Sequence, residues 1–337
     1  MRNYLDRLVW DREPRINTWL STYGGAEDPA PDSSEEQSYL EAVSSIFLIA
    51  AVRRVRTPGT KFDEMLILEA PQGTLKSSAL RVLCPDDNWF SDDLPLGVRA
   101  KEVIECSAGK FIIEASELQG YTNAQVDHLK SMMARQTDGP VRLAYGHFSV
   151  EVPRQFVLVG TTNKLTEYLR DSTGNRRFWP VRVTRFNVAA LERDRDPLWA
   201  EAAYREAAGE SIRLPERLWT AAAVEQDARR QIDPWEELLD DSAVISLVAE
   251  AIPVESLWAA LGDAGKYFKR NDAERLAQIM QRFGYTRKKK IDVIYIPVKD
   301  GVELAPSEPV RKYAWVREGT DPSRIEIRRD VKPESPY

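Results

Sequence analysis

Apolar and polar positions in the first half of the chain predict buried strands separated by helices. Apolar residues recur at helical spacing over 37–56, after a polar, Pro-rich stretch that is expected to end in a helix cap at Ser33 or Ser34. Three short apolar runs predict strands, at 65–68, 111–113 and 155–159. A helix over 77–82 follows the first of them. This order indicates an α/β domain with a mostly parallel central sheet.

A β-hairpin is expected just before the third strand, where 141–145 and 148–152 flank a Gly-His pair. Residues 188–230 are rich in Ala, Glu and Arg and are expected to be helical. The remaining elements are three helices and a strand, at 243–251, 254–261, 271–283 and 291–297. Helices that precede a β-ribbon with a basic flank resemble a winged helix.

The composition is that of a soluble globular protein, with 43% hydrophobic and 30% charged residues among 337. No apolar run approaches the roughly 18–20 residues of a membrane-spanning helix, and the first residues lack the apolar core of a signal peptide. Cys84 and Cys106 stand in unrelated contexts, which gives no support to a disulfide framework or a zinc site. We therefore expect a cytoplasmic protein without a membrane partner.

The net charge of −6 argues against DNA contact over the whole surface, because phosphate binding needs local positive charge. Basic residues nevertheless form two clusters, which are Arg176 with Arg177, and Arg287, Lys288, Lys289 and Lys290. Any contact with DNA should be confined to such patches.

A phosphate-binding loop is expected between the first strand and its helix. In the P-loop pattern G-x-x-x-x-G-K-[ST], backbone amides wrap the phosphates, the lysine reaches the outer phosphates and the hydroxyl binds Mg²⁺. Lys76 and Ser77 would take the last two roles, with ATP and Mg²⁺ as ligands. The other residues expected to line the nucleotide are Gln72, Gly73, Thr74, Leu75 and Ser78.

The match to this pattern is imperfect, because Ala70 replaces the first glycine and Leu75 the last. A Cβ at position 75 crowds the loop only if that residue needs a positive φ or touches a phosphate. Two alternatives stay open. The segment could be a strand–turn–helix that contains Lys-Ser by chance, or an altered loop that binds nucleotide weakly or not at all.

Acidic and amide side chains follow the next two strands. Glu114 and Glu117 come after the second strand, where a P-loop enzyme needs an acid to hold Mg²⁺ through water and to orient the attacking water. Asn163 ends the third strand and would sense the γ-phosphate. The alternatives are ordinary surface acids and a polar turn.

Paired arginines stand beside a turn after the third strand. Arg176 or Arg177 could complete a neighbouring subunit's ATP site as an arginine finger, with Arg135 as a weaker candidate. The alternative is a solvated face or a set of salt-bridge partners.

The ordered series of segments resembles the virulence-associated protein E (VirE/VapE-like) family, which belongs with the superfamily 3 helicase-like P-loop ATPases. Besides the P-loop, the segments that carry the resemblance are YLDRLVWD at 4–11, PRINTWL at 14–20, RTPGTKFD at 56–63, IEASEL at 113–118, the run at 153–163, YLRD at 168–171, GNRRFWPV at 174–181 and LWAEA at 198–202. They cover most of the chain, from Tyr4 to about Phe283.

The resemblance implies a DNA-dependent ATPase of a phage, plasmid or other mobile element, acting in DNA replication in a bacterial host. It implies a homo-oligomeric ring of six or seven subunits on single-stranded or origin DNA, and a primase or initiator protein as partner. The chain starts almost directly at the ATPase region, so any primase is expected to be on another polypeptide or to be absent. The family's P-loop usually has a glycine before its lysine, which Leu75 replaces here.

Superfamily 3 helicases place a DNA-tracking hairpin just before the sensor strand, where the hairpin over 141–152 is expected. Its Arg142, Tyr145 and His147 would project into the channel of a ring and contact a DNA strand, the alternative being a purely structural hairpin. The four basic residues at 287–290 would add phosphate contacts from the winged-helix-like region.

The domain organisation expected from these features has five regions. They are an N-terminal helical segment (1–62), a P-loop ATPase core (63–185), a helical connector (186–240), a winged-helix-like domain (241–320) and a loose tail (321–337). Two functions compete with the ring-forming motor. One is a DNA-binding or interaction protein with an altered P-loop that regulates replication, and the other is a small-molecule kinase.

Overall fold

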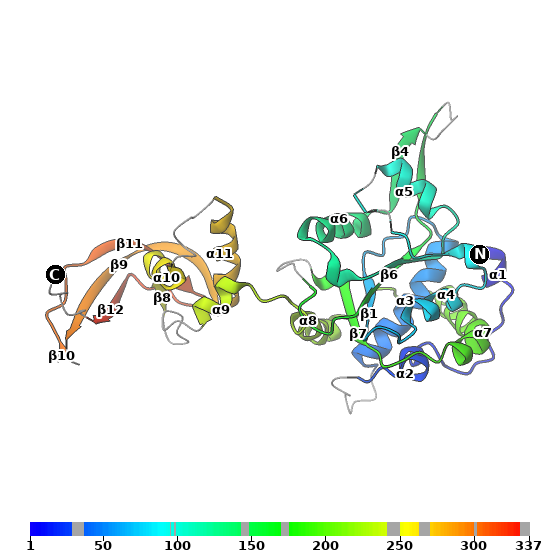
Figure 1. The fold of residues 1–337 in the computed structure, drawn as a ribbon, viewed down its shortest axis with the longest axis horizontal. Coiled ribbons are helices and arrows are strands. Elements are labelled where there is room, and N and C mark those ends of the chain that lie inside the picture. Colours follow the sequence, from blue (N-terminus) through cyan, green and yellow to red (C-terminus); the bar gives the residue numbers. More distant parts are fainter. Residues whose placement is uncertain are drawn as a thin grey trace. The chain divides into compact units, whose positions relative to one another are not determined.

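The computed structural model describes residues 1–28, 37–94, 96–97, 99–142, 148–169, 175–240, 250–262, 270–299 and 302–330. The chain divides into two compact units, Met1–Gln231 and Ile232–Tyr337 (Figure 1). Each unit has its own buried apolar clusters, and none of these clusters includes residues of both units. The boundary lies inside the segment 186–240 that the sequence suggests as a connector.

A parallel sheet of five strands forms the centre of the first unit, as the sequence predicts. In spatial order its strands are β2 (Phe90–Ser91), β3 (Ile112–Ala115), β6 (Val157–Thr162), β1 (Met65–Glu69) and β7 (Phe178–Arg182). β1, β3 and β6 are buried along their whole length, which is why they appear in the sequence as continuous apolar runs. Their carboxyl ends meet at one edge of the sheet.

Helices cover both faces of this sheet. In chain order they are α1 (Arg2–Leu5), α2 (Trp19–Gly24), α3 (Tyr39–Arg56), α4 (Lys76–Leu83), α5 (Ala100–Ser107), α6 (Asn123–Ala134), α7 (Val188–Ala207) and α8 (Trp219–Asp227). Alternate residues of β1 serve the two layers. Leu66 and Leu68 pack with the apolar cluster of α3 and α7, whereas Met65 and Ile67 pack with that of α6.

Helix α3 begins later than the sequence suggests. Its N-cap is Ser38, whose hydroxyl accepts from the Glu41 amide while the Glu41 carboxylate accepts from the Ser38 amide. This reciprocal S-x-x-E capping box fixes the start of the helix at Tyr39, so the expected cap at Ser33 or Ser34 is wrong. Ser33 and Ser34 themselves lie outside the described residues.

The predicted hairpin is present and consists of β4 (Thr137–Arg142) and β5 (Ser149–Pro153), paired antiparallel. A buried ion pair closes its base, where the Arg154 guanidinium donates to both Asp138 carboxylate oxygens at 2.6 and 2.5 Å. Arg142 is exposed at the end of β4. Tyr145 and His147 lie outside the described residues.

The second unit combines helices α9 (Pro234–Asp240), α10 (Val254–Leu261) and α11 (Arg270–Arg282) with a second sheet (Figure 1). The sheet has the order β10 (Val302–Glu303), β9 (Tyr285–Lys299), β11 (Val310–Arg317) and β8 (Ala251–Pro253), all antiparallel. β12 (Arg324–Asp330) pairs with β9 in parallel. The unit therefore has five strands, more than the ribbon expected of a winged helix.

Two expectations for this region need correction, and a third is tested only at its last two residues. β9 starts at Tyr285 rather than 291, so the basic run 287–290 lies within the strand. The expected loose tail contains the strand β12, whose charged side chains hid it from the apolar pattern. Most of the helix expected at 243–251 falls outside the described residues, and Ala251 begins β8. No described helix is long and apolar enough to cross a membrane.

Candidate nucleotide-binding site

The loop between β1 and α4 adopts a turn with two left-handed residues. Gly73 has a φ of 83° and Leu75, the N-cap of α4, a φ of 67°. Glycine adopts this conformation at no steric cost, whereas a residue with a Cβ does so at roughly 1–2 kcal/mol. Position 75 therefore does need a positive φ, and leucine is strained where the P-loop pattern has glycine.

Lys76 lies at the start of α4 with its ammonium group turned into the loop. Its Nζ donates to the Ala70 and Pro71 carbonyls at 2.6 and 3.2 Å, to Thr74 Oγ1 at 3.3 Å and to Asn163 Oδ1 at 3.2 Å. Burial lowers the pKa of this lysine, and the nearby Glu114 carboxylate partly opposes that shift. An incoming phosphate would have to replace these loop oxygens as the acceptor for Lys76.

Glu114 is fully buried at the end of β3, between two hydroxyl groups. Its Oε1 accepts from Ser77 Oγ at 2.8 Å and from Thr161 Oγ1 at 2.6 Å. Its Oε2 is buried and has no hydrogen-bond partner among the described residues. A buried carboxylate oxygen without a partner is rare in folded proteins, and an ion or a water usually fills that role.

The residues present fit a Mg²⁺ ion. Mg²⁺ prefers oxygen ligands, keeps several waters and is usually held by one or two carboxylates together with substrate phosphates. Ser77 Oγ and the unpartnered oxygen of Glu114 supply such ligands. No cluster of three or more His, Cys, Asp or Glu suited to a metal occurs within the described ranges.

A cavity of about 350 Å³ lies over the loop at the carboxyl edge of the sheet. It brings together the residues predicted for ATP, Mg²⁺ and the attacking water. The residues that line it are Gln72, Gly73, Thr74, Leu75, Lys76, Ser77, Ser78, Glu114, Ser116, Glu117, Thr161, Thr162 and Asn163. Glu117 is exposed here and has a left-handed φ of 52°.

Four side chains at this site were not predicted from the sequence, which are Ser116, Thr161 and Thr162 in the cavity lining and Gln119 beside them. Thr161 donates to Glu114, and Gln119 Oε1 accepts from Thr162 Oγ1 at 2.8 Å and from the Asn163 amide at 3.2 Å. Gln119 thereby fixes the end of β6 and the position of Asn163. Thr161 could have been predicted as a site residue, because it is a polar residue near the end of a predicted strand. No local sequence pattern predicts a role for Gln119.

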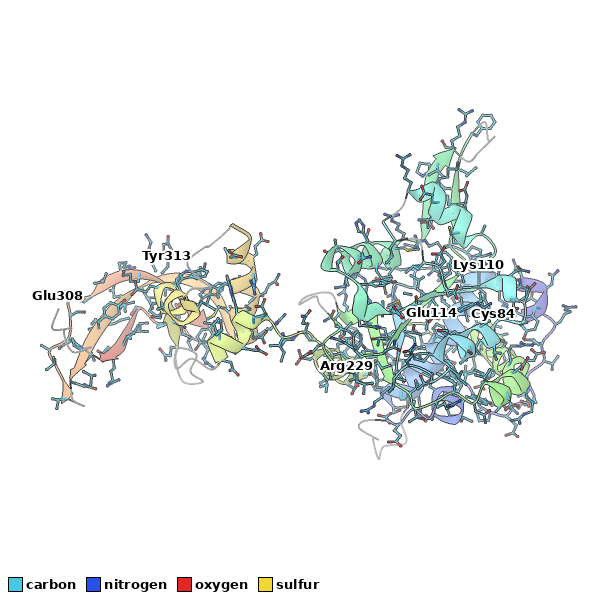
Figure 2. All side chains as sticks on the ribbon, viewed as in Figure 1. Cys84, Lys110, Glu114, Arg229, Glu308 and Tyr313 are labelled. Atoms are coloured by element: carbon cyan, nitrogen blue, oxygen red, sulfur yellow. The ribbon has the colours of Figure 1, made fainter. Side chains whose placement is uncertain are left out.

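A buried ion-pair network holds the end of β1, where the loop begins, and was also not predicted from the sequence. Glu69, the last residue of β1, is fully buried. The guanidinium of Arg229, which is labelled in Figure 2, donates to both Glu69 carboxylate oxygens at 2.9 and 3.0 Å. The Tyr168 hydroxyl also donates to Glu69, and burial raises the pKa of Tyr168 well above its usual value. The network holds the strand that leads into the loop, yet Arg229 is 160 residues away in sequence.

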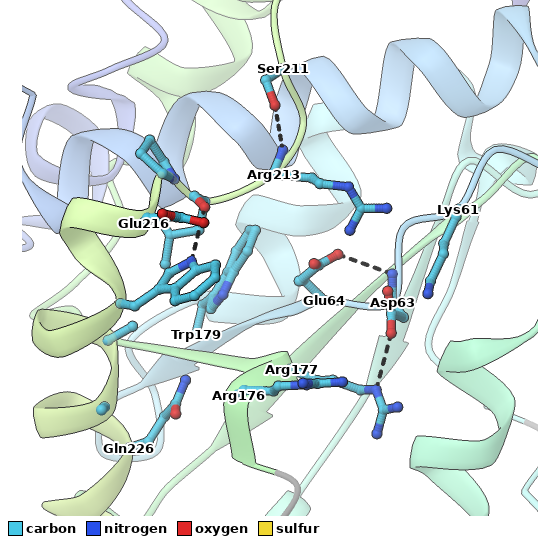
Figure 3. Close-up of a pocket in the computed structure, with 15 residues that line it drawn as sticks. Lys61, Asp63, Glu64, Arg176, Arg177, Trp179, Ser211, Arg213, Glu216 and Gln226 are labelled. Carbon is cyan, nitrogen blue, oxygen red and sulfur yellow. Dashed lines mark hydrogen bonds and ion pairs between the residues drawn. The ribbon is translucent and has the colours of Figure 1, made fainter.

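The paired arginines lie at the opposite edge of the sheet from the loop. β7 runs parallel to β1, with Phe178 beside Met65, so Arg176 and Arg177 precede β7 at the edge where β1 begins. Arg177 donates to Asp63 at 3.2 Å, whereas Arg176 is exposed and forms no salt bridge within the described residues. Both line a cavity of about 780 Å³ (Figure 3).

These arginines cannot reach the candidate nucleotide site of the same chain, because the length of β1 separates them from Lys76. Arg135, the weaker candidate, is the exposed C-cap of α6.

In this parallel sheet the inner strand β1 runs through such a loop into a helix, and a buried acid ends β3, two strands away. Such an arrangement defines a P-loop NTPase-like fold. The chain belongs to the virulence-associated protein E-like domain family, whose profile matches residues 5–231. The resemblance inferred from the sequence is thus confirmed, and the matched region ends where the first unit ends.

The fold is similar to that of the apo structure of the NrS-1 C-terminal region (305–718), with a TM-score of 0.50 and 12% identity over 93% of this chain and 78% of that chain. The A-form apo structure of that region gives a TM-score of 0.47 at 13% identity with the same coverage. The X-ray structure of JCV helicase gives 0.27 at 10% identity, over 58% of this chain and 64% of that chain. No curated protein matches the sequence significantly.

Proposed function

We propose that the chain is a DNA-dependent ATPase of the superfamily 3 helicase-like kind that acts as a ring-forming motor on DNA. One observation carries the proposal. Lys76, Ser77, Glu114 and Asn163 come from three different segments, and hydrogen bonds link them in pairs at one edge of the sheet. Phosphoryl transfer demands little covalent chemistry from a protein, so a site that positions charge and water in this way is sufficient.

Each residue has a distinct role in the proposed hydrolysis. Lys76 would neutralise charge on the outer phosphates, and Ser77 with Glu114 would hold Mg²⁺, which would supply positive charge against the phosphates. Glu117, exposed at the cavity, polarises the attacking water. Asn163 senses the γ-phosphate, since its amide oxygen already lies 3.2 Å from the Lys76 ammonium.

The ring is supported by the place of the paired arginines. A residue that lies at the far edge of its own sheet can serve catalysis only in another subunit's site, as arginine fingers do. Because Arg177 already pairs with Asp63, the exposed Arg176 is the better candidate for this role. A head-to-tail interface forms a ring when its rotation closes, and the family resemblance suggests six or seven subunits.

The hairpin is proposed as the part that contacts DNA inside the ring. Phe148, which the sequence reasoning did not select, is 84% exposed just before β5 and offers an apolar ring to a base. Arg142, Tyr145 and His147 complete this proposed contact. Replication of a phage or plasmid, with a separate primase or initiator as partner, is the setting that the family resemblance suggests.

Steady-state ATP hydrolysis, with and without single-stranded DNA, tests the proposal. We expect Mg²⁺-dependent turnover that DNA stimulates and that Lys76→Ala abolishes. Lys101→Ala, which removes a half-buried lysine that pairs with Glu105 on α5 outside the site, is the matched control. Turnover that persists unchanged in Lys76→Ala would remove the loop from the mechanism.

A second function is favoured by one observation, the strained backbone of Leu75. A strained loop whose leucine side chain occupies part of the phosphate cavity could leave a DNA-binding protein that regulates replication without efficient hydrolysis. Binding of DNA without any measurable turnover would select this function over the motor.

A further inference from the structure

Strands β9 and β11 carry three cation–aromatic pairs in register. Arg317 lies opposite Tyr285, Lys288 opposite Trp315, and Lys290 opposite Tyr313. In each pair the cation stands over the ring, at 4.9, 5.1 and 5.0 Å from its centre. Residues directly opposite each other on paired strands share a face of the sheet, so the pairs form one continuous cation–aromatic ladder.

Exposure increases along this ladder. Tyr285 is fully buried and Trp315 is 5% exposed, because both pack in the apolar cluster with α9, α10 and α11. Tyr313, at the other end, is 57% exposed, and Lys290 beside it is exposed as well. The buried end holds the ladder rigid, and the open end presents an aromatic ring and an ammonium group to solvent.

Positive charge is concentrated on the same two strands. β9 and β11 together contain eight Lys or Arg residues and one acid, Asp292, in a chain whose net charge is −6. Three of the eight form salt bridges with N–O distances of 2.8 to 3.2 Å. The pairs are Lys289 with Asp321, Lys312 with Glu255, and Arg311 with Asp292. Lys288 and Lys290, both on the ladder, form no salt bridge with any described carboxylate.

We propose that the open end of this ladder is a binding site for single-stranded DNA. Lys288 and Lys290 pair with successive phosphates, and an unpaired base stacks on Tyr313, since every base offers a flat face and stacking tolerates any sequence. A duplex keeps its bases stacked inside the helix, so it would meet only the charges. The proposal deepens the proposed function by naming the site and strandedness of its DNA, and it does not require ATP hydrolysis.

The four basic residues of the run 287–290 are therefore not equivalent. Lys289 points to the opposite face from Lys288 and Lys290, because side chains alternate along a strand, and it is already paired with Asp321. The chain thus supplies its own control, a lysine between the two proposed contacts whose loss removes the same charge from the other face.

Binding of a fluorescent dT30 oligonucleotide to the full chain without nucleotide, followed by anisotropy, tests the site. We expect Tyr313→Ala to weaken binding at least about fivefold and Tyr313→Phe to leave it unchanged. The double variant Lys288→Ala/Lys290→Ala should weaken binding. Its slope of log K against log salt concentration should be smaller in magnitude by about 1.4, the value for two phosphates of a single strand. Lys289→Ala should match the wild type.

Two further measurements separate this proposal from binding through charge alone and from the proposed ATPase activity. With a 30-base-pair duplex, Tyr313→Ala should bind like the wild type, because no base is free to stack. Lys76→Ala should bind dT30 normally, so failure of the ATPase leaves this test intact. The proposal is overturned if Tyr313→Ala binds dT30 like the wild type in a folded protein, or if Lys289→Ala reduces the salt dependence as much per charge as the ladder variant.

Discussion

Leu75 takes a backbone conformation that glycine adopts freely, at the position where the loop meets α4. We expect Leu75→Gly to raise nucleotide affinity several-fold and to leave stability near that of the wild type. Relief of the strain contributes about 1 kcal/mol, and the greater freedom of glycine in the unfolded chain offsets roughly 0.5–1 kcal/mol of it. Titration with a fluorescent ATP analogue and thermal unfolding measure the two quantities.

Leu75→Ala is the control for this change, because it trims the side chain but keeps the Cβ and hence the strain. If Leu75→Ala gains as much affinity as Leu75→Gly, the bulk of the leucine side chain, and not its φ of 67°, limits nucleotide binding.

Glu114, in β3, is buried and Glu117, after β3, is exposed, and we expect their glutamine variants to lose different activities. Glu114→Gln should lose Mg²⁺-dependent ATP binding, because the unpartnered carboxylate oxygen becomes an amide group that carries hydrogens and cannot bind a cation. Glu117→Gln, which changes an exposed side chain, should still bind ATP and hydrolyse it at least 100-fold more slowly. Equilibrium binding and single-turnover hydrolysis distinguish the two, and normal hydrolysis by Glu117→Gln would make Glu117 a structural residue.

At the scale of elements, β1 depends on an ion pair from the far end of its unit. Arg229→Ala would leave the Glu69 carboxylate buried without its partner, which typically costs about 3–5 kcal/mol of folding free energy. Chemical denaturation of the full chain measures this loss. Glu69→Gln in the Arg229→Ala background should recover part of it, since the buried charge is gone. A double variant no more stable than Arg229→Ala would show that the network acts through packing alone.

Sequence patterns predicted the elements whose signal is local. β1, β3 and β6 are continuous apolar runs, and their polar ends, together with Gly73 and Lys76, located the candidate site before the fold was known. The start of β9 and the strand β12 were missed because their charged residues hide them, and pairing with neighbouring strands makes them strands.

Contacts between distant segments could not be predicted from local patterns. Arg229 follows a helix and resembles any surface arginine until the fold brings it to Glu69, and Gln119 gains its role only beside Asn163. The sequence leaves open whether position 75 needs a positive φ, because that depends on how β1 and α4 are held in place.

At the scale of the whole molecule, the two units are expected to fold independently, because their apolar clusters are separate. A fragment of residues 1–231 should therefore unfold cooperatively and retain ATP binding. A fragment of residues 1–227 should be several kcal/mol less stable, because it lacks Arg229. Thermal unfolding followed by circular dichroism compares them, and equal stability would exclude the ion pair as a support of the first unit.

A shared site between subunits can be tested by mixing inactive variants. Lys76→Ala and Arg176→Ala should each lack hydrolysis, whereas a one-to-one mixture assembled on DNA should recover about one quarter of the wild-type rate, because about one interface in four combines an intact loop with an intact arginine. Inactivity of the mixture, despite assembly seen by light scattering, would place the site within one subunit.

The buried Arg154–Asp138 ion pair makes the hairpin a stiff arm clamped at its root. The six residues of β4 span about 20 Å, and Arg154 lies three residues before the strand that ends at the sensor amide. By simple leverage, a tilt of about 10° at the root moves the far end of the arm by about 3.5 Å. That displacement is close to the rise of about 3.4 Å between nucleotides on one strand. A small change of angle at the phosphate site would thus displace the far end of the hairpin by about the spacing between two neighbouring nucleotides.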